Sequence, residues 1–389
     1  MSNQTIHYDY IIIGAGAAGL MLAKAMSQDS FFDNSSILLL DKDSKTTNDR
    51  TWCFWEKGKG PFDHLVSKEW KHIHFSGKGF SKDYKIAPFT YKMVKGLDFY
   101  EDALNYISTK NNIRFKVEEV LSIEDKNEFA FITTSKQTYS SKRVFNSMFS
   151  YDRANQQTTY PVLQQHFLGW KIRTDQAVFD KDKATYMDFS VPQKGNTRFM
   201  YMLPFSSNEA LVEYTLFSKD LLSEAEYKDA LQTYISEDLQ IKNFEIVDTE
   251  YGSIPMTCYP FSKNNSRHIY HIGTAGGWAK PSTGYAFMST ARKIPKLIHH
   301  LKTDKSLNIL KFKNRFWYYD LILLDVLAKN NSQGHSIFTS IFRKRSPQLL
   351  FNFLDENTSL KEELYFIWSC PKWLFTKYLA KRLGITKKS

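Results

Sequence analysis

A glycine-rich turn near the start of the chain constrains the fold more than any other feature of the sequence. Residues 14–19 read GAGAAG, which fills the pattern G-x-G-x-x-G. An apolar run, Tyr8–Ile13, precedes the turn, and good helix formers follow it over residues 17–26. A second apolar run, Ile37–Leu40, ends at Asp41. This order of strand, glycine turn, helix, strand and acid predicts the opening of a Rossmann-type dinucleotide-binding domain.

Each residue type in the turn has a physical reason to be there. Gly14 permits the tight turn, Gly16 lets the backbone approach a pyrophosphate, and Gly19 allows the helix to pack closely on the strand. Ala17 opens the helix, whose positive end favours the phosphates, and Asp41 can accept hydrogen bonds from ribose hydroxyls. The alternative is an ordinary glycine-rich loop, which the surrounding strands and the acid make the weaker interpretation. We expect these five residues to contact a dinucleotide.

A second glycine cluster lies far downstream. Residues 271–277 (HIGTAGG) follow an apolar strand, and 281–285 (PSTGY) lead into a helix that starts near Ala286. Alone, this could be an ordinary strand-to-helix turn. Together with the first motif it resembles the two-domain flavoproteins related to aromatic hydroxylases. That resemblance implies that the chain re-enters the cofactor domain here and contacts the flavin side of FAD through glycines of the cluster, namely Gly273, Gly276 and Gly284.

The region between the two glycine clusters is rich in strands. Runs at 185–191, 198–204 and 210–217 are separated by QKGN and SSNE, which predicts an antiparallel meander. A helix is expected at 223–235, and the chain is mostly helical from Phe312 onward. The expected fold class is therefore α/β, with a Rossmann-type FAD-binding domain interleaved with an antiparallel substrate domain. The expected boundaries are residues 1–75, 95–155 and 265–305 for the FAD-binding domain, 76–94 and 156–264 for the substrate domain, and 306–389 for a C-terminal helical region.

Composition limits the class of protein. The chain has 389 residues, and its aromatic fraction of 15% supplies material for an apolar pocket. Three cysteines without a C-x-x-C pair indicate neither a disulfide framework nor a metal site, so no metal is expected. The first seven residues do not resemble a signal peptide, and no apolar run approaches the roughly eighteen residues of a spanning helix. We expect a cytoplasmic protein that does not cross a membrane.

The net charge of +11 is compatible with nucleic acid, an acidic substrate or an anionic membrane surface. Its position along the chain is more informative. The segment 372–388 carries Lys372, Lys377, Lys381, Arg382, Lys387 and Lys388, and its apolar residues at helical spacing are Leu374, Phe375, Tyr378, Leu379 and Leu383. This pattern predicts a basic amphipathic helix able to lie on an anionic bilayer. The alternative is a terminal helix packed on the core with a solvated basic face.

Four segments carry a more specific resemblance. They are residues 49–55 (DRTWCFW), 199–206 (FMYMLPFS), 211–215 (LVEYT) and 276–285 (GGWAKPSTGY), and together they resemble the bacterial-type lycopene β-cyclases over nearly the whole chain. The resemblance implies FAD that is active in its reduced form, with NAD(P)H as the reductant. It implies lycopene and a monocyclic carotenoid as substrates, no nucleic acid, and peripheral association with the inner face of the cell membrane. A substrate that dissolves only in membranes favours the lipid-facing interpretation of the C-terminal helix.

The implied reaction is acid-catalysed and involves no net redox change. An acid protonates the terminal double bond of an acyclic end group, the carbocation closes a six-membered ring, and a proton leaves. Lycopene would thereby become γ-carotene and then β-carotene, with β-ionone rings. Such chemistry needs a carboxylic acid in an apolar, water-poor environment, because burial raises the pKa of the acid and water would intercept the cation.

Glu213 is the main candidate for this acid. Alternation along strand 210–217 places Leu211, Glu213, Thr215 and Phe217 on one face. A solvated face, with Glu213 as a surface residue, is the alternative from the pattern alone. The resemblance assigns the position to the catalytic acid of a motif of the F-L-E-E-T type, whose second acidic position is Tyr214 here. Asp188, on the first strand of the meander, is a second candidate for catalysis.

The remaining residues with chemical potential leave alternatives open. Arg50 could clamp the flavin or the mouth of the pocket, or it could belong to an aromatic cluster with a surface ion pair. His166 and His271 are assigned no role, because single histidines are more often structural. The resemblance also marks a departure at Thr274, where related flavoproteins often carry aspartate.

Two other functions share the expected fold. An FAD-dependent hydroxylase of the aromatic-hydroxylase type would usually carry an Asp-Gly motif in mid-chain, and the corresponding strand reads VFNSM over residues 144–148. A non-catalytic flavin-binding module would need no acid beside an apolar pocket. The sequence makes no prediction about the oligomeric state.

Overall fold

The computed structural model describes residues 5–303, 305–310 and 312–385. The chain forms two compact units, each assembled from three segments. The first unit contains Met1–Trp52, Val94–Thr159 and Tyr259–Asn314, and the second contains Cys53–Met93, Tyr160–Cys258 and Arg315–Ser389. Residues 53–75, expected from the sequence in the FAD-binding domain, and the C-terminal helices both fall in the second unit.

The first unit is built on a parallel sheet of five strands. Its order is β19 (Ile269–His271), β13 (Arg143–Asn146), β2 (Tyr10–Ile13), β3 (Ile37–Asp41) and β9 (Ile113–Val117), and every neighbouring pair is parallel. The central strands are almost wholly apolar because both faces are covered, as parallel sheets require. This confirms the strand, helix and strand expected at the start of the chain.

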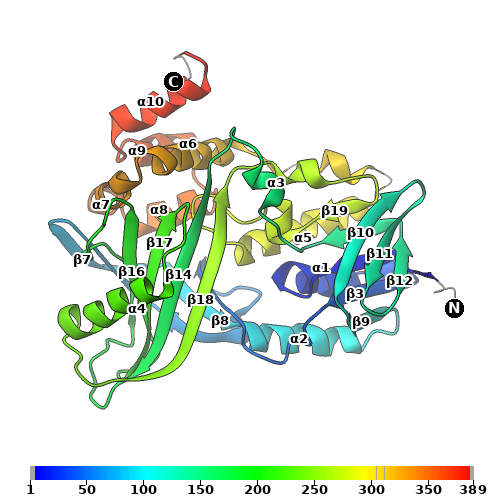
Figure 1. The fold of residues 1–389 in the computed structure, drawn as a ribbon, viewed down its shortest axis with the longest axis horizontal. Coiled ribbons are helices and arrows are strands. Elements are labelled where there is room, and N and C mark those ends of the chain that lie inside the picture. The colour runs from blue at the N-terminus through cyan, green and yellow to red at the C-terminus, as the bar shows by residue number, and fades with distance from the viewer. Residues whose placement is uncertain (1–4, 304, 311, 386–389) are drawn as a thin grey trace. The chain divides into compact units, whose positions relative to one another are not determined.

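Two different layers cover the faces of this sheet. Helix α1 (Ala17–Ser27) packs against α2 (Gly96–Ser108) and α5 (Phe287–Leu301), as Figure 1 shows. The other face packs against a second sheet, with strand order β1 (Ile6–His7), β12 (Thr138–Ser141), β11 (Phe129–Thr134) and β10 (Val120–Lys126). Ile11 and Ile13 point toward Ile132 and Tyr139 of that second sheet. Side chains alternate along β2, so one set faces the helices and the other faces the second sheet.

The second unit is built on a sheet of seven strands. Its order is β18 (Glu245–Thr257), β14 (Val162–Arg173), β17 (Glu209–Ser218), β16 (Thr197–Pro204), β15 (Lys183–Asp188), β6 (His72–Gly77) and β7 (Phe80–Lys85). The expected meander is present as β15, β16 and β17. The two long strands β14 and β18 extend the sheet beyond it, and the sequence did not predict them. All neighbours are antiparallel except β15 and β6.

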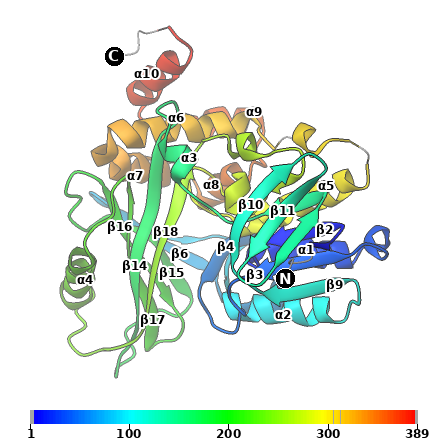
Figure 2. The same cartoon turned by 45° about the vertical axis from the view of Figure 1, so that its right-hand side comes forward.

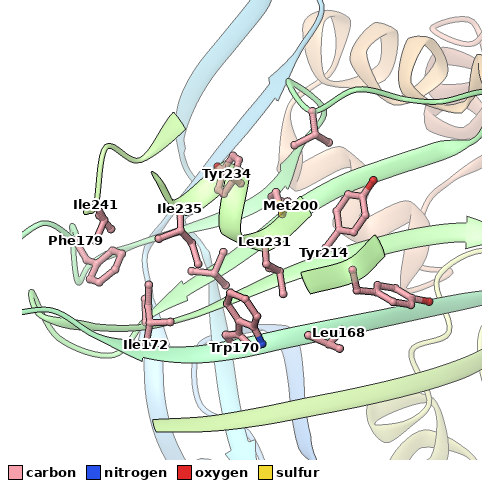
Figure 3. Packing of buried hydrophobic residues seen from close by; sticks show 14 of the residues in the cluster. Leu168, Trp170, Ile172, Phe179, Met200, Tyr214, Leu231, Tyr234, Ile235 and Ile241 are labelled. Atoms are coloured by element: carbon pink, nitrogen blue, oxygen red, sulfur yellow. The ribbon is translucent and has the colours of Figure 1, made fainter. Parts of the chain in front are cut away.

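One face of this sheet is covered by α4 (Glu224–Thr233) and the π-helical turn Tyr234–Asp238. Ser223 caps α4 by accepting a hydrogen bond from the backbone amide of Glu226, as the sequence suggested. Figure 3 shows Leu231 and Ile235 of this layer against side chains of the sheet such as Trp170. The face therefore belongs to the apolar core.

The rest of the second unit is a small sheet and a set of helices. The sheet has the order β4 (Thr51–Lys57), β8 (Phe89–Lys95) and β5 (Val66–Trp70). The helices are α6 (Arg315–Lys329), α7 (Gly334–Lys344), α8 (Pro347–Leu354), α9 (Leu360–Ile367) and α10 (Lys372–Arg382). In Figure 2, α10 follows α9 and lies near α6, against which it packs. Lys387 and Lys388 lie outside the described residues.

Candidate active site

The first glycine turn has the shape that a pyrophosphate requires. Gly14 has a φ of 92°, and a Cβ there would lie 2.1 Å from the Oγ of Ser147. A Cβ on Gly19 would lie 1.9 Å from the carbonyl oxygen of Gly14, so helix and strand touch at this glycine. A Cβ on Gly16 would meet no described atom within 4 Å. The backbone at Gly16, directly before Ala17 opens α1, is therefore open to a ligand at the positive end of the helix.

Asp41 is fixed beside this turn at the end of β3. Its Oδ2 accepts a hydrogen bond of 2.6 Å from the backbone amide of Ala15, and its Oδ1 accepts one of 2.9 Å from the amide of Asp43. The Nζ of Lys45 lies 3.4 Å from Oδ2. The carboxylate is thus held beside the glycine turn by backbone amides and by Lys45.

The second glycine turn packs onto the first. Gly273 has a φ of 59°, and a Cβ there would lie 2.7 Å from the Cβ of Ala18 in the first turn of α1. A Cβ on Gly276 would lie 2.3 Å from the carbonyl oxygen of His271. Both glycines therefore permit a close approach that a side chain would prevent. The two motifs, more than 250 residues apart in the sequence, meet in one place.

The loop after the second turn ends in another glycine with a positive φ angle. Gly284 has a φ of 71° and donates its amide to the carbonyl oxygen of Lys280 at 2.8 Å. Ser282 in the same loop is only 5% exposed, and its Oγ has no hydrogen-bond partner among the described residues. A buried hydroxyl without a partner carries a desolvation cost, so it is suited to a bound group. The sequence analysis quoted this segment without singling out Ser282.

Arg50 belongs to a polar and aromatic cluster in the first unit. Its Nη2 donates to the Oδ2 of Asp49 at 2.8 Å, and the hydroxyl of Tyr100 donates to Oδ1 at 2.7 Å. Burial raises the pKa of Asp49, but these two hydrogen bonds hold it below its usual value. The adjacent Trp52 stacks on Phe287, with ring centroids 4.8 Å apart, at the start of α5. The side chain of Arg50 is about half exposed.

Glu213 lies buried in the seven-stranded sheet of the second unit. It is 6% exposed, which contradicts the surface interpretation left open by the sequence. The hydroxyl of Thr215 donates a hydrogen bond to its Oε1. Burial, followed by the negative charge of Glu250, raises the pKa of Glu213 to about 8. A carboxyl group with this pKa holds its proton at neutral pH and can donate it.

Two tyrosines and a cysteine lie near Glu213. Tyr201 faces it from the neighbouring strand β16, and the hydroxyls of Tyr201 and Tyr91 are 2.6 Å apart. Cys53 of β4 hydrogen-bonds with Tyr201, and burial raises the pKa of its thiol to about 12. Burial likewise raises the pKa of Tyr91 well above its usual value. Cys53 and Tyr91 therefore remain uncharged at neutral pH.

Glu250 is the functional candidate that the sequence reasoning missed. It lies on β18, where burial and the charge of Asp248 raise its pKa to about 7. Gly169 of β14 pairs with Glu213 on one side and with Glu250 on the other. Acids at alternate positions, as in Asp248 and Glu250, are typical of a solvated strand, so the pattern contained no signal for burial.

Asp188 lies on the opposite face of the sheet from Glu213. Its Oδ2 accepts a hydrogen bond of 2.8 Å from the hydroxyl of Tyr234, and its Oδ1 accepts one of 2.9 Å from the amide of Ser190. Its cross-strand partner Met200 pairs in turn with Tyr214, and both belong to the core under α4. The structure therefore does not bring the two candidate acids together, and Asp188 serves to anchor the π-helical turn.

The two unassigned histidines are held in the interior. His166 hydrogen-bonds with the hydroxyls of Tyr227 and Ser218, and burial lowers its pKa to about 4. His271 contacts the Oδ1 of Asn265, and burial lowers its pKa to about 4 as well. Both rings are neutral near pH 7. Among the described residues no cluster of histidine, cysteine and acids could hold a metal.

The C-terminal helix α10 has one face packed on the fold and one face exposed. Leu374 and Tyr378 are buried, whereas Trp373 is 66% exposed. Arg382 forms two hydrogen bonds of 2.6 Å with the carboxylate of Asp325 and is therefore used within the fold. The exposed apolar side chains of this region are Leu360, Leu364, Tyr365, Trp368, Trp373, Leu379, Leu383 and Ile385, which we call the C-terminal apolar surface. In the described part of the chain no helix is long and apolar enough to span a membrane.

Comparisons with known proteins give a family and a fold. A family model described as lycopene cyclase protein matches residues 9–379. No curated protein matched the sequence. Among solved structures, a geranylgeranyl bacteriochlorophyll reductase-like protein from Thermoplasma acidophilum has a TM-score of 0.60 and 12% identity, covering 96% of this chain and 99% of that one.

Two further solved structures are similar. The flavin-dependent brominase Bmp2 has a TM-score of 0.58 and 14% identity, covering 98% of this chain and 100% of its own. The p-nitrophenol 4-monooxygenase PnpA from Pseudomonas putida DLL-E4 has a TM-score of 0.56 and 11% identity, covering 97% of both chains. At these identities the likeness shows the fold, which is the α/β architecture expected from the sequence.

Proposed function

Because the chain belongs to the lycopene cyclase family, we propose that it is a lycopene β-cyclase, which closes the acyclic ends of lycopene into β-ionone rings. The observation that carries this proposal is Glu213, a buried carboxylic acid whose pKa of about 8 keeps it protonated at neutral pH. The substrates would be lycopene and then the monocyclic carotenoid. The products would be γ-carotene and β-carotene.

Glu213 would transfer its proton to the terminal double bond of the end group. The resulting tertiary cation is attacked by the internal double bond, a carbon–carbon bond closes the ring, and a proton leaves from the ring. Neutral neighbours such as Tyr91 and Cys53 suit this step, because they remain protonated and add no further anionic nucleophile beside the cation. An alkene is a poor base, so an acid shielded from water is essential.

The first unit fits FAD. The open backbone at Gly16, the carboxylate of Asp41 and the close contact of Gly273 with α1 form a cradle of the kind that a dinucleotide needs. The unpartnered hydroxyl of Ser282 and the guanidinium of Arg50 are further donors for the bound group. FAD in its reduced form, obtained with NAD(P)H, would supply an electron-rich ring system able to stabilise positive charge.

The C-terminal apolar surface supports a place at a membrane. Trp368 and Trp373 are both 66% exposed, and the Nζ of Lys372 lies 3.3 Å from the ring centroid of Trp368. Exposed tryptophans beside lysines are typical of proteins that bind the interface of an anionic bilayer. We therefore propose peripheral binding to the inner face of the cell membrane, where a carotenoid would be dissolved.

A hydroxylase of the same fold is the alternative function, as the likeness to PnpA indicates. The two reactions differ in their stoichiometry. Cyclisation isomerises the substrate and consumes neither oxygen nor a stoichiometric reductant, whereas hydroxylation consumes both. The test is anaerobic incubation of the purified protein with FAD, dithionite and lycopene in liposomes, followed by pigment chromatography. Formation of β-carotene supports the cyclase. Its absence, together with oxygen-dependent NAD(P)H oxidation in a parallel aerobic incubation, would select the hydroxylase.

A further inference from the structure

We propose that Glu250, brought beside Glu213 across Gly169, is a positioning residue whose carboxylate holds the proton on Glu213. This inference rests on the function proposed above. It assigns a second carboxyl group to the acid site, on a strand that does not carry the family motif. Tyr214, which occupies the second acidic position of that motif, lies on the opposite face.

The register of the sheet places the two glutamates symmetrically about Gly169. Strand β14 lies between β17 and β18, and Gly169 pairs with Glu213 in one neighbour and with Glu250 in the other. Residues that pair across antiparallel strands point to the same face of a sheet. Two strand spacings separate the two backbones by about 9 to 10 Å, a gap that two glutamate side chains can bridge when nothing stands between them.

Because residue 169 is a glycine, no side chain stands between the two glutamates. A Cβ there would lie 3.3 Å from the Cγ of Glu250 and 3.4 Å from the Cβ of Glu213. It would also lie 3.0 Å from the Cδ1 of Leu211. Both glutamate stems therefore already occupy the space above the glycine. Glycine weakens a strand interior, so its presence here is explained by the approach of other groups.

The charges that shift the pKa values of the pair are of one sign. The groups that act on the two carboxyls are Thr215 of β17 and the acids Glu250 and Asp248 of β18. Lys171 of β14 lies on the same face, opposite Asp248, and its Nζ is paired with Glu209 at 2.8 Å. A like charge disfavours ionisation of its neighbour, so ionised Glu250 raises the pKa of Glu213 beyond the effect of burial alone.

One proton shared by the pair also closes the catalytic cycle. Donation leaves Glu213 ionised beside ionised Glu250, which is the least favourable state of two close carboxylates. The C–H bond formed at the alkene uses the proton of Glu213, and the ring proton released after closure restores one proton to the pair. No electron or atom is gained or lost overall, as an isomerisation requires.

The test uses the full-length protein with reduced FAD and measures two quantities against pH. The first is the cyclisation rate in liposomes, whose alkaline limb reports loss of the proton from Glu213. The second is the infrared carbonyl band of a protonated carboxyl group, identified by its loss in Glu213→Gln, which needs no substrate. In Glu250→Gln we expect both titrations to move to lower pH by about one unit. Glu250→Asp keeps the charge and should move them less.

Two more variants complete the test. Glu245→Gln is the matched control, because Glu245 is an exposed carboxylate on the same strand and should leave both titrations unchanged. Gly169→Ala keeps both carboxyls but places a methyl group between them, so it should shift the titrations in the same direction as Glu250→Gln. It therefore tests the proposal even if Glu250→Gln does not fold.

Unchanged titrations in Glu250→Gln and Gly169→Ala would overturn the assignment of Glu250. If the wild-type protein does not cyclise lycopene, the proposed function fails. The infrared titration then still decides whether Glu250 holds the proton on Glu213, so the two failures are distinguishable.

Discussion

Replacing Glu213 with glutamine should abolish cyclisation and, at alkaline pH, make the protein more stable. Glutamine keeps the shape of the side chain and can still accept the hydrogen bond from Thr215, but it has no acidic proton. General acids typically contribute about 10²- to 10⁴-fold to a rate, and protonation of an alkene belongs at the upper end of that range. If Glu213 had only a structural role, its replacement would instead make the protein less stable. Loss of activity together with a gain in stability at alkaline pH would therefore identify a catalytic acid.

The stability gain follows from the raised pKa. Folding lifts the pKa of Glu213 from 4.5 to about 8, so between these values the folded protein holds a proton that the unfolded chain has released. Its contribution to stability is fully present below pH 4.5 and is lost as the pH rises through 8. At about 1.4 kcal/mol per pH unit, the upper limit of this loss is about 5 kcal/mol. Glutamine has no such titration, so its advantage grows as the pH rises from 4.5, is complete above about 8 and disappears in acid.

Denaturant unfolding at about pH 5.5 and about pH 8.5 measures the stability difference, and pigment chromatography measures the rate. Asp188→Asn is the matched control, since it replaces a buried acid on the other face of the same sheet. Loss of its charged hydrogen bonds to Tyr234 and Ser190 should cost about 1 to 3 kcal/mol with cyclisation largely retained. If Glu213→Gln keeps more than about a tenth of the activity while Asp188→Asn abolishes it, against the contribution expected of a general acid, the proton donor has been assigned to the wrong residue.

Three further outcomes are expected. Gly16→Val should fold, since a Cβ there meets no described atom within 4 Å, yet purify without flavin because the side chain blocks the pyrophosphate; normal flavin absorbance in that variant would remove Gly16 from the site. A single anaerobic reduction of FAD should support many turnovers, and one NAD(P)H oxidised per ring would contradict an isomerisation. Replacing Trp368 and Trp373 with serine should weaken sedimentation with anionic liposomes, while unchanged binding would exclude the C-terminal apolar surface as the membrane contact.

The elements predicted best from the sequence are those whose signal is local. The first glycine turn, with α1 and β3 after it, is specified by residues that follow one another, so backbone sterics and apolar periodicity suffice to predict it. The meander strands and the cap at Ser223 are predictable for the same reason. The position of Glu213 on its strand was predicted, whereas its burial depends on strands that are distant in the sequence.

The residues that were missed depend on such long-range pairing. Glu250 lies on a strand with exposed acids, and only the register with β14 brings it to Gly169. A one-residue slip of that register would turn its side chain to the other face, and no local pattern fixes it. The face occupied by Asp188 also could not be read from the sequence, because a bulge between Thr185 and Asp188 interrupts the simple alternation along β15.

The features of the acid site support the proposed cyclisation over hydroxylation. A flavin hydroxylase acts through oxygen bound at its cofactor and does not require a protonated glutamate at neutral pH. On this sheet face two carboxyls are held close together at a cost in folding stability. Both pKa values are raised, and the strand between the two acids carries a glycine. Buried groups with perturbed pKa values are retained where function needs them. An acid with a pKa of about 8 keeps its proton at neutral pH, and the second carboxyl beside it can take part in recovering that proton, as the proposed cyclisation requires.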